Sequence, residues 1–378
     1  MTSGNPSFLW TVLSFLLVIG PLIFIHELGH YLVGRWFGVK ADVFSIGFGR
    51  ELAGWTDRRG TRWKLCWLPL GGYVKFAGDM NPASQPSPEW LAMPAEERAR
   101  TFQAKKVWQR FLIVAAGPVT NFILAILVFC GFLMAYGEPR TPAVISAIEP
   151  GSPAAAAGLR PGDRITAIDG SEVDRFEDIA NHVVLRPGER LRISFQRDGR
   201  AGEVFATAKA AVERDKFGNE FKRGMLGVGA SERVIEPVSP GAALVGAFRM
   251  TGQIVGTTVE GLEQIITGRR SVKELGGPLK IAKFSGEQAS LGLLAFLWFV
   301  AVISINLGFI NLLPIPMLDG GHLLLYAIEG VRRKPLRPEA QEWAFRTGLA
   351  ALLALMVFVT LNDLASFGLL TKLGGLID

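Results

Sequence analysis

Two histidines four residues apart, with a glutamate directly after the first, stand in the stretch FIHELGHYLVG as His26, Glu27 and His30. On a helix this spacing places both imidazoles on one face. Two neutral imidazoles can bind Zn²⁺ while the free carboxylate accepts a proton from a water that the metal activates. The pattern therefore predicts zinc-dependent hydrolytic chemistry in which Glu27 handles the proton.

A third metal ligand is needed, because catalytic zinc sites combine three protein ligands with one open position. Asp319, in INLLPIPMLDGGHLLL, is our candidate, since an ionised carboxylate in an apolar stretch needs a cationic partner. His322 is either a neighbour that supports the site or an interfacial histidine at a helix end, and we favour the second interpretation. His182 falls in a region with the composition of a soluble module.

The residues before Asp319 predict an irregular backbone. Pro314 and Pro316 remove backbone donors and forbid a regular helix. Such backbone is tolerated at membrane depth only where it lines protein or a wet cavity, so Pro314 and Pro316 should border the site and take part in substrate binding. Asn311 could hold the scissile backbone or the developing oxyanion, or it could brace the broken helix.

The elements that position these residues are membrane helices. Hydrophobic residues make up 49% of the 378, 25 of them Phe, and the mean hydropathy is +0.30, which is high for a soluble protein. Four apolar stretches approach the roughly 20 residues that cross a bilayer; they are 8–25, 111–136, 291–313 and 348–367. Histidine and glutamate inside such a stretch usually mark a functional site.

The net charge of +6 reflects topology rather than nucleic-acid binding, because the basic residues cluster in two loops, 40–106 and 332–337. The positive-inside rule puts both loops in the cytoplasm. The N-terminus, residues 137–290 and the C-terminus then lie on the outer side. Cys66 and Cys130 do not predict a disulfide framework.

Between the spans, residues 40–79 predict strands broken by glycines, in a hairpin apolar enough to dip into the membrane interface. The Pro- and Ser-rich stretch that follows predicts an exposed connection ending in a short helix. Residues 142–212 predict a compact α+β module. Residues 241–268 predict an amphipathic helix near the outer membrane surface.

His26-Glu27-x-x-His30, taken with Asn311-x-x-Pro314-x-Pro316-x-Leu318-Asp319-Gly320, closely resembles the site-2 protease family of intramembrane zinc metalloproteases. The resemblance covers essentially the whole chain, including AAGPVTNF with Gly117, Pro118 and Asn121, and it is greatest to the bacterial regulator of sigma-E protease branch. It implies a multi-pass α-helical membrane protein of four transmembrane helices, with a reentrant β loop and an inserted α+β PDZ-like domain. This chain has one PDZ-like domain, whereas the better-known relative has two. The way in which the relative's two domains admit substrates therefore does not apply in detail to this chain.

The resemblance also implies a substrate and a location. Gly71, Gly72 and Tyr73 match the reentrant loop, whose edge could bind an unwound substrate by β-addition. The substrates would be single-pass transmembrane proteins, such as an anti-sigma factor or remnant signal peptides, within the membrane lipid of the bacterial inner membrane. The PDZ domain would be periplasmic and act as a filter, and the active site would lie toward the cytoplasm.

The predicted organisation divides the chain into nine segments. They are transmembrane helix 1 (1–39), the reentrant β region (40–79), a cytoplasmic connection (80–108), transmembrane helix 2 (109–137), the PDZ domain (138–215), a post-PDZ region with the amphipathic helix (216–290), transmembrane helix 3 (291–330), a cytoplasmic loop (331–345) and transmembrane helix 4 (346–378).

Two other functions compete with the protease. One is a membrane-anchored PDZ scaffold with a structural metal, and the other is a zinc carrier, which would need polar residues along a path to both membrane faces. Structural zinc sites are usually closed by four protein ligands, and only three good candidates are visible here, so the sequence favours the enzyme. The oligomeric state is left open.

Overall fold

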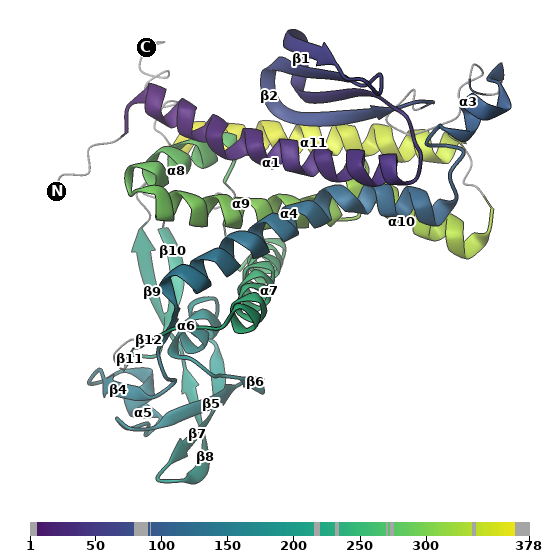
Figure 1. Ribbon diagram of the computed structural model, residues 1–378. Coiled ribbons are helices and arrows are strands. Elements are labelled where there is room, and N and C mark those ends of the chain that lie inside the picture. Colours follow the sequence, from purple (N-terminus) through teal and green to yellow (C-terminus); the bar gives the residue numbers. More distant parts are fainter. Residues whose placement is uncertain are drawn as a thin grey trace, which may run out of the picture. The chain divides into compact units, whose positions relative to one another are not determined.

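The computed structural model describes residues 6–78, 90, 92–214, 220–230, 234–269, 271–272, 276–334 and 338–366. The chain divides into two compact units. The first combines Met1–Val128 with Gly276–Asp363, and the second combines Phe129–Leu275 with Leu364–Asp378. Figure 1 shows the helices and strands of both.

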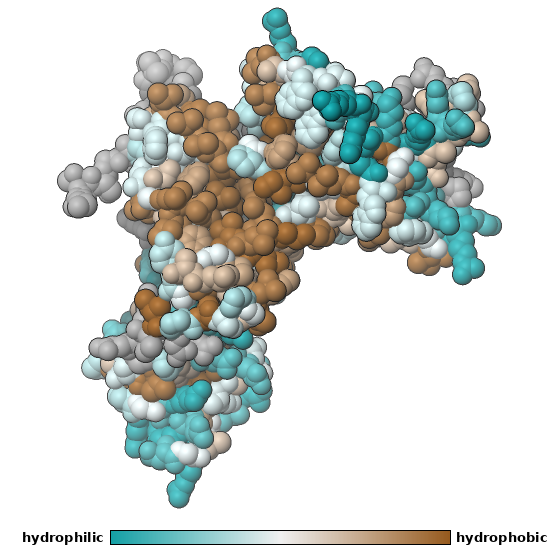
Figure 2. All heavy atoms as spheres, viewed as in Figure 1, coloured by the Kyte–Doolittle hydropathy of each residue, from teal (hydrophilic) through white to brown (hydrophobic). Residues whose placement is uncertain are grey.

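Four long apolar helices confirm the four predicted spans within the described residues. They are α1 (Phe8–Trp36), α4 (Val107–Tyr136), α9 (Leu293–Leu312) and the part Gln341–Ser366 of α11 (Pro338–Ser366). Many of their large apolar side chains are exposed, and Figure 2 shows these residues gathered over the helices of the first unit. An apolar surface of this extent is stable in lipid rather than in water, so the chain is a membrane protein.

The third span is interrupted, as the two prolines predicted. Helix α9 ends at Leu312, and a second helix, α10 (Asp319–Arg332), begins at the aspartate. The short helix α8 (Pro278–Ser290) precedes α9. Asp363 of α11 is fully buried and accepts hydrogen bonds from the backbone N–H groups of Gly277 and Lys280, both at 3.1 Å, which ties the start of α8 to the fourth span.

The glycine-rich hairpin predicted over 40–79 forms from β1 (Ala41–Thr56) and β2 (Arg62–Phe76). Both strands bend, so that Phe44 pairs with Trp63 on one side and with Val74 on the other. The bends occur at glycines with positive φ, including Gly47 and Gly71, a conformation that favours glycine. Residues 72–76 consequently form an outer edge, which pairs with no other strand in the described part of the chain.

The connection predicted for 80–108 lies partly outside the described residues. Within the described part, α3 (Ala95–Ala99) is the short helix expected before the second span. Trp90 donates a hydrogen bond from its indole to Thr101 Oγ1 at 2.7 Å, which anchors this segment to the loop before α4.

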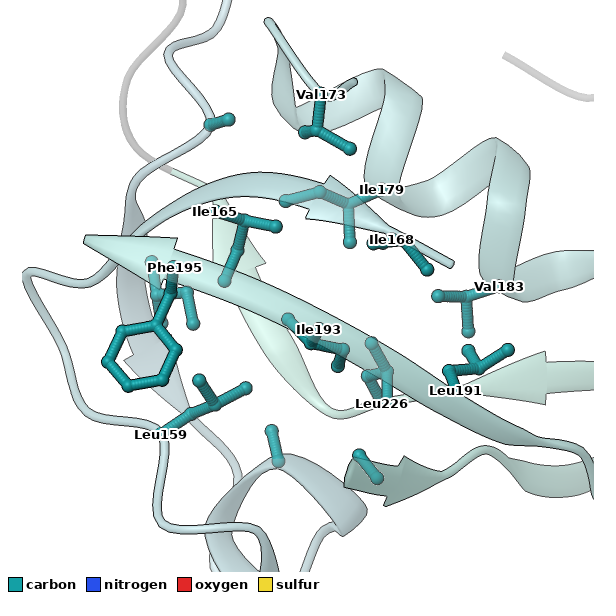
Figure 3. Packing of buried hydrophobic residues seen from close by; sticks show 14 of the residues in the cluster. Leu159, Ile165, Ile168, Val173, Ile179, Val183, Leu191, Ile193, Phe195 and Leu226 are labelled. Atoms are coloured by element: carbon teal, nitrogen blue, oxygen red, sulfur yellow. The ribbon is translucent and has the colours of Figure 1, made fainter. Parts of the chain in front are cut away.

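In the second unit, the described residues between 138 and 236 form the compact α+β module that the sequence predicts. A four-stranded sheet in the order β6-β5-β7-β8 packs its apolar face against α6 (Phe176–Val184), and the short helix α5 (Pro153–Ala156) covers the end of the core. Ile165, Ile193 and Ile179 meet in this core (Figure 3). The strands are β3 (Glu138–Arg140), β4 (Ile145–Ile148), β5 (Arg164–Ile168), β6 (Ser171–Glu172), β7 (Arg190–Arg197), β8 (Arg200–Thr207), β9 (Lys209–Arg214), β10 (Glu220–Met225), β11 (Val228–Ala230) and β12 (Val234–Glu236).

The module extends beyond the boundary predicted at 215/216. Leu226, only 4% exposed, belongs to the module core, β11 pairs with β4, and β12 pairs with β3. The sequence-based boundary put residues 216–290 in a separate post-PDZ region, whereas Leu226, β11 and β12 contact the module directly. The cause is non-local pairing: these strands complete a module whose first strands lie about 80 residues earlier, and no local pattern reveals such a partner.

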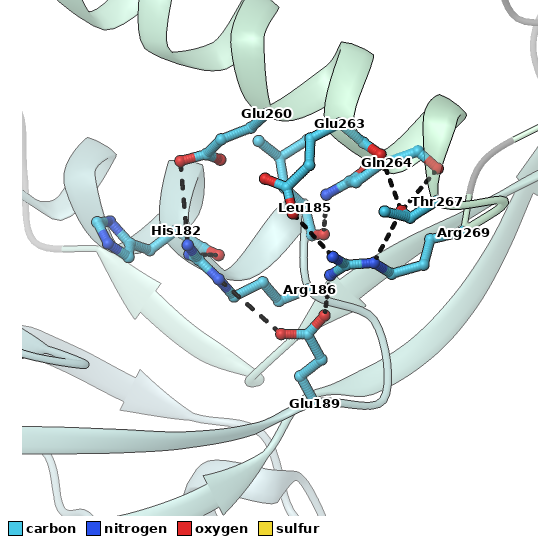
Figure 4. A network of polar contacts seen from close by, with 9 residues as sticks. All are labelled: His182, Leu185, Arg186, Glu189, Glu260, Glu263, Gln264, Thr267 and Arg269. Atoms are coloured by element: carbon cyan, nitrogen blue, oxygen red, sulfur yellow. Dashed lines mark hydrogen bonds and ion pairs between the residues drawn. The ribbon is translucent and has the colours of Figure 1, made fainter.

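Helix α7 (Pro240–Ile266) confirms the helix predicted over 241–268 and starts with Ser239 as N-cap and Pro240 in the first turn. Polar contacts join its C-terminal half to the end of α6 (Figure 4). Gln264, 8% exposed, donates a hydrogen bond to the Leu185 carbonyl. Glu189 lies 3.2 Å from Arg269 and 4.0 Å from Arg186, so one carboxylate joins two arginines from different elements.

Candidate active site

The His-Glu-x-x-His motif lies in the C-terminal part of α1, where helical geometry stacks the two histidines on one face. Their Nε2 atoms are 3.2 Å apart. Gly29 lies between them and faces α4, where a Cβ would come within 2.5 Å of the Ala116 carbonyl oxygen. Only glycine allows this approach of two membrane helices, which is how small residues promote close packing in lipid.

Asp319, at the first position of α10, completes the cluster. Its Oδ2 atom lies 3.1 Å from His26 Nε2 and 3.5 Å from His30 Nε2. These three residues form a group of potential metal-ligating atoms among the described residues. Tetrahedral ligands at about 2.0–2.1 Å from zinc lie about 3.3 Å from one another, which matches this triangle.

The outer ring nitrogen of each histidine is held by α4. His30 Nδ1 donates to the Ile113 carbonyl at 2.9 Å, which leaves its Nε2 lone pair directed at the cluster. His26 Nδ1 lies 3.1 Å from the side-chain amide of Asn121, and Asn121 Oδ1 is buried without a hydrogen-bond partner. With that oxygen turned toward Nδ1, Asn121 accepts from His26 as well, and both Nε2 lone pairs face inward.

Three electron-rich atoms pointed at one another repel unless a cation lies between them. Asp319 Oδ2 is buried, and no described group donates a hydrogen bond to it. The donor set of two imidazoles and one carboxylate suits zinc with one position left for water. The residues present therefore fit a catalytic zinc ion.

Gly117 of α4 makes room for the cluster. A Cβ at this position would fall 2.2 Å from His30 Nε2 and 2.9 Å from His26 Nε2. The α4 backbone is in turn held against α9, because Ser304 Oγ donates to the Asn121 carbonyl at 2.8 Å. Helix α1 is thus linked to α4 through the histidines, and α4 is linked to α9 through Ser304.

The turn before α10 places Asp319. Leu318 precedes the helix as its N-cap, and Met317 has a φ of 80°, which is uncommon for a residue with a side chain. A Cβ at Gly320 would fall 2.1 Å from the Leu313 carbonyl oxygen, and one at Gly321 would fall 2.4 Å from that of Ile315. The two glycines after Asp319 are therefore required for the turn to fold back under the first turn of α10.

Glu27 faces the same space. It is 8% exposed and lines a cavity of about 530 Å³ together with both histidines and Asp319. The edge of β2 closes over it: a Cβ at Gly72 would fall 2.9 Å from Glu27 Cγ and 2.7 Å from the Ser45 carbonyl oxygen. A buried carboxylate beside a metal-binding cluster, next to a strand edge, is suited to proton transfer on a bound peptide.

Most residues predicted for substrate binding reach this cavity. Asn311, Gly71, Gly72 and Tyr73 line it. The two prolines do not: Pro314 is exposed, and Pro316 packs beneath α11, where a Cβ at Gly348 would fall 2.5 Å from Pro316 Cβ. They shape the turn rather than the cavity wall.

His322 also lines the cavity, which favours the first interpretation, a neighbour that supports the site. It follows Asp319 by one helical turn, lines the cavity, and packs its ring 4.7 Å from that of Phe345. It does lie near a helix end, as the sequence suggested, but this end is the first turn of α10, which begins at Asp319 in the cluster.

The model of peptidase family M50 matches residues 14–355, which include both the histidine motif and Asp319. The chain belongs to this family, the site-2 proteases. It is therefore a zinc metalloprotease by family.

Relatives of this M50 protease match along nearly their whole length. A predicted zinc metalloprotease of Agrobacterium fabrum is 45% identical over 94% of this chain and 96% of its own. Metalloprotease MmpA of Caulobacter vibrioides is 39% identical over 98% and 99%. Among solved structures, the PDZ domain of an SdrC-like protein from Listeria monocytogenes covers 24% of this chain and 88% of its own, at 20% identity and a TM-score of 0.19.

Two supporting residues of the M50 site were not recognised from the sequence. Gly117 and Asn121 belong to the family resemblance, but the sequence assigns neither of them a role at the metal site. The available signal was the combination of glycine, threonine and asparagine on one face of an apolar helix, since polar and small residues inside a span usually contact another helix.

Proposed function

We propose that this site-2 protease cleaves the transmembrane segments of single-pass proteins, with His26, His30 and Asp319 as zinc ligands and Glu27 as the group that transfers protons. The observation that carries the proposal is the convergence of three ligand atoms within 3.5 Å of one another beside a buried glutamate. The cluster lies among helices long and apolar enough to cross a membrane.

The zinc ion, when bound, supplies Lewis-acid activation of water and of the substrate carbonyl. Glu27 accepts the proton that the attacking water loses and passes it to the nitrogen of the leaving amine, which balances the hydrolysis. Asn311 can donate its side-chain amide to the carbonyl oxygen as negative charge develops there. Burial of Glu27 keeps bulk water away from the proton that it carries.

The substrate must be extended before it can react, because a helical peptide carbonyl is shielded by its own hydrogen bonds. Residues 72–76 offer an unpaired strand edge that borders the cavity at Gly72 and Tyr73. Addition of an unwound substrate segment to this edge would bring its backbone alongside Glu27. We therefore assign Gly71, Gly72 and Tyr73 to substrate binding, within a membrane-reentrant hairpin.

The basic loops indicate how the protein is oriented in the membrane. The protein lies in the bacterial inner membrane, with the hairpin and the loop after α10 in the cytoplasm and the module of residues 138–236 in the periplasm. The module acts as a PDZ-type filter for substrates with trimmed outer domains. An anti-sigma factor or a remnant signal peptide has the required single-pass form.

The test is co-expression of wild-type protein or Glu27→Gln with single-pass substrates carrying tags on both ends. We expect a truncated product with wild type and a loss of at least about 100-fold with the variant, because general acid–base catalysis contributes at least that much. Zinc content, measured on both purified proteins, should be equal. Equal cleavage by both proteins would exclude the proposed role of Glu27 and favour a scaffold.

A further inference from the structure

A second cavity, separate from the catalytic one, lies between the start of α4 and the end of α10. It has a volume of about 510 Å³, within the range of small-molecule sites, and shares no lining residue with the cavity at Glu27. Its walls are almost entirely apolar, and they are formed by Val107, Trp108, Phe111, Leu112, Tyr326 and Gly330. We call this cavity the α4–α10 groove.

The groove is braced by an ion pair. Arg110 Nη2 lies 3.2 Å from Glu329 Oε2, and the Arg110 guanidinium lies 4.9 Å from the centre of the Tyr326 ring. Both charged side chains are largely buried, 15% and 14% exposed, so the pair holds the two helices at a defined separation. Gly330 contributes the open space, because a Cβ there would meet no atom within 4 Å.

The side of the groove is open. Trp108, Phe111 and Leu112 are 54%, 37% and 45% exposed on a helix that is apolar enough to span a membrane. The solvent along such a helix is lipid, so apolar chains rather than water meet the groove. We therefore expect an acyl chain to occupy the α4–α10 groove.

The end of the groove is basic. Helices α4 and α10 run in opposite directions: Arg110 meets Glu329 near the end of α10, whereas Ile113 and Asp319, at the start of α10, both contact His30. One further turn beyond the Arg110–Glu329 pair therefore brings Lys106 on one side and Arg333 on the other. Arg332 and Lys334 flank Arg333, and all four side chains are exposed. Each such cation near a membrane surface attracts an anionic lipid by about 1 kcal/mol.

We propose that the α4–α10 groove is a binding site for an anionic phospholipid. One acyl chain lies along Trp108, Phe111 and Leu112, and the phosphate-bearing head group lies among Lys106 and the basic residues that end α10. Because lipid binding needs neither zinc nor Glu27, the inference stands apart from the proposed proteolytic function.

Native mass spectrometry of the purified full-length protein tests this site with phosphatidylglycerol and phosphatidylcholine of identical acyl chains. The wild-type protein should retain phosphatidylglycerol at least about fivefold more strongly than phosphatidylcholine, which is the factor that one cationic side chain near the head group supplies. Gly330→Leu should lose both lipids at this site, because the new side chain fills the groove. Gly131→Leu is the matched control, since a Cβ at Gly131 of α4 also meets no atom within 4 Å.

A second variant separates the head-group contact from the acyl-chain contact. Replacing Lys106, Arg332, Arg333 and Lys334 by Gln should abolish the preference for phosphatidylglycerol while one phosphatidylcholine is still retained. Unchanged zinc content shows that each variant is folded around its catalytic cavity. Equal retention of both lipids by wild type, or retention by Gly330→Leu equal to that by Gly131→Leu, would overturn the proposal.

Discussion

Gly117 shows how much of the metal-binding geometry depends on an absent side chain. The histidines are held on their outer nitrogens by the Ile113 carbonyl and by Asn121, so neither ring can retreat freely from α4. A methyl group at Gly117 would lie 2.2 Å from His30 Nε2, well inside van der Waals contact. The residue therefore acts through the histidines, as a positioning residue.

We expect Gly117→Ala to weaken zinc binding by about 10–100-fold, the range found when groups that orient metal ligands are altered. Overpacking should also cost about 1–3 kcal/mol of stability. Zinc retained after dialysis against graded chelator measures the first effect, and thermal unfolding in detergent measures the second. Gly131→Ala, on the same helix, should match wild type in both. Unaltered zinc retention in Gly117→Ala would show that the histidines can move aside.

At the scale of elements, α7 is joined to the module by Glu189, which faces Arg186 and Arg269. These side chains are 26–51% exposed, so each ion pair contributes only about 0–1 kcal/mol. Such contacts are too weak to determine the fold. They can nevertheless determine how often the end of α7 separates from α6.

Glu189→Gln should accordingly leave the unfolding temperature within a few degrees of wild type while amide exchange in the last two turns of α7 becomes several-fold faster. Hydrogen–deuterium exchange of the full-length protein measures this local opening. Glu203→Gln, an exposed position on β8, is the control. Equal exchange in both variants would mean that the remaining contacts of α7, from Gln264, Glu260 and Gln253, hold it without Glu189.

The module also contains a pH-dependent ion pair. Burial raises the pKa of Asp163, but two hydrogen bonds from the Arg197 guanidinium, at 2.6 and 2.7 Å, and one from the Arg160 backbone N–H outweigh it and hold the pKa below its ordinary value. A lowered carboxylate pKa stabilises the folded state above the unfolded pKa, and this stabilisation is lost as the pH falls through the folded value.

The module should therefore lose stability as the pH falls below about 4, the ordinary pKa of an aspartate. Asp163→Asn should be less stable at pH 7, by about 1.5–3 kcal/mol for its charge-assisted hydrogen bonds, and should show a flatter dependence on acid. Hydrogen–deuterium exchange of the β5 and β7 backbone amides, corrected for the intrinsic effect of pH on exchange, measures the stability of the module in both proteins. Parallel acid profiles for both proteins would contradict the assignment.

For the whole molecule, the proposed topology places the turn of the β1–β2 hairpin and the module on opposite sides of the membrane. Arg59→Cys and Ser171→Cys, each in a chain whose free cysteines Cys66 and Cys130 are replaced by Ala, report on the two positions, which are both exposed. A membrane-impermeant maleimide should label the second in intact spheroplasts and the first only after lysis. The reverse labelling pattern would show that the topology is the opposite of the one proposed.

Local chemistry in the sequence accounts for the elements and for the reacting groups. Apolar runs of about the length that crosses a bilayer predicted the four spans, since a helix satisfies its own backbone hydrogen bonds in lipid. The four-residue histidine spacing needs only helical periodicity, and Pro314 with Pro316 required the break before Asp319. The role of these side chains as zinc ligands stays a prediction, but the structure does bring His26, His30 and Asp319 together.

Only the tertiary structure decided what supports those groups. Gly117 and Asn121 gain their importance from helices separated by about 90 residues, His322 turns inward because α10 starts at Asp319, and Leu226 completes a core begun some 80 residues earlier. A sequence pattern records periodicity and solvent preference along one element. Packing between elements decides which backbone segments come within about 3 Å of one another. At such distances a single methyl group determines whether two helices can meet.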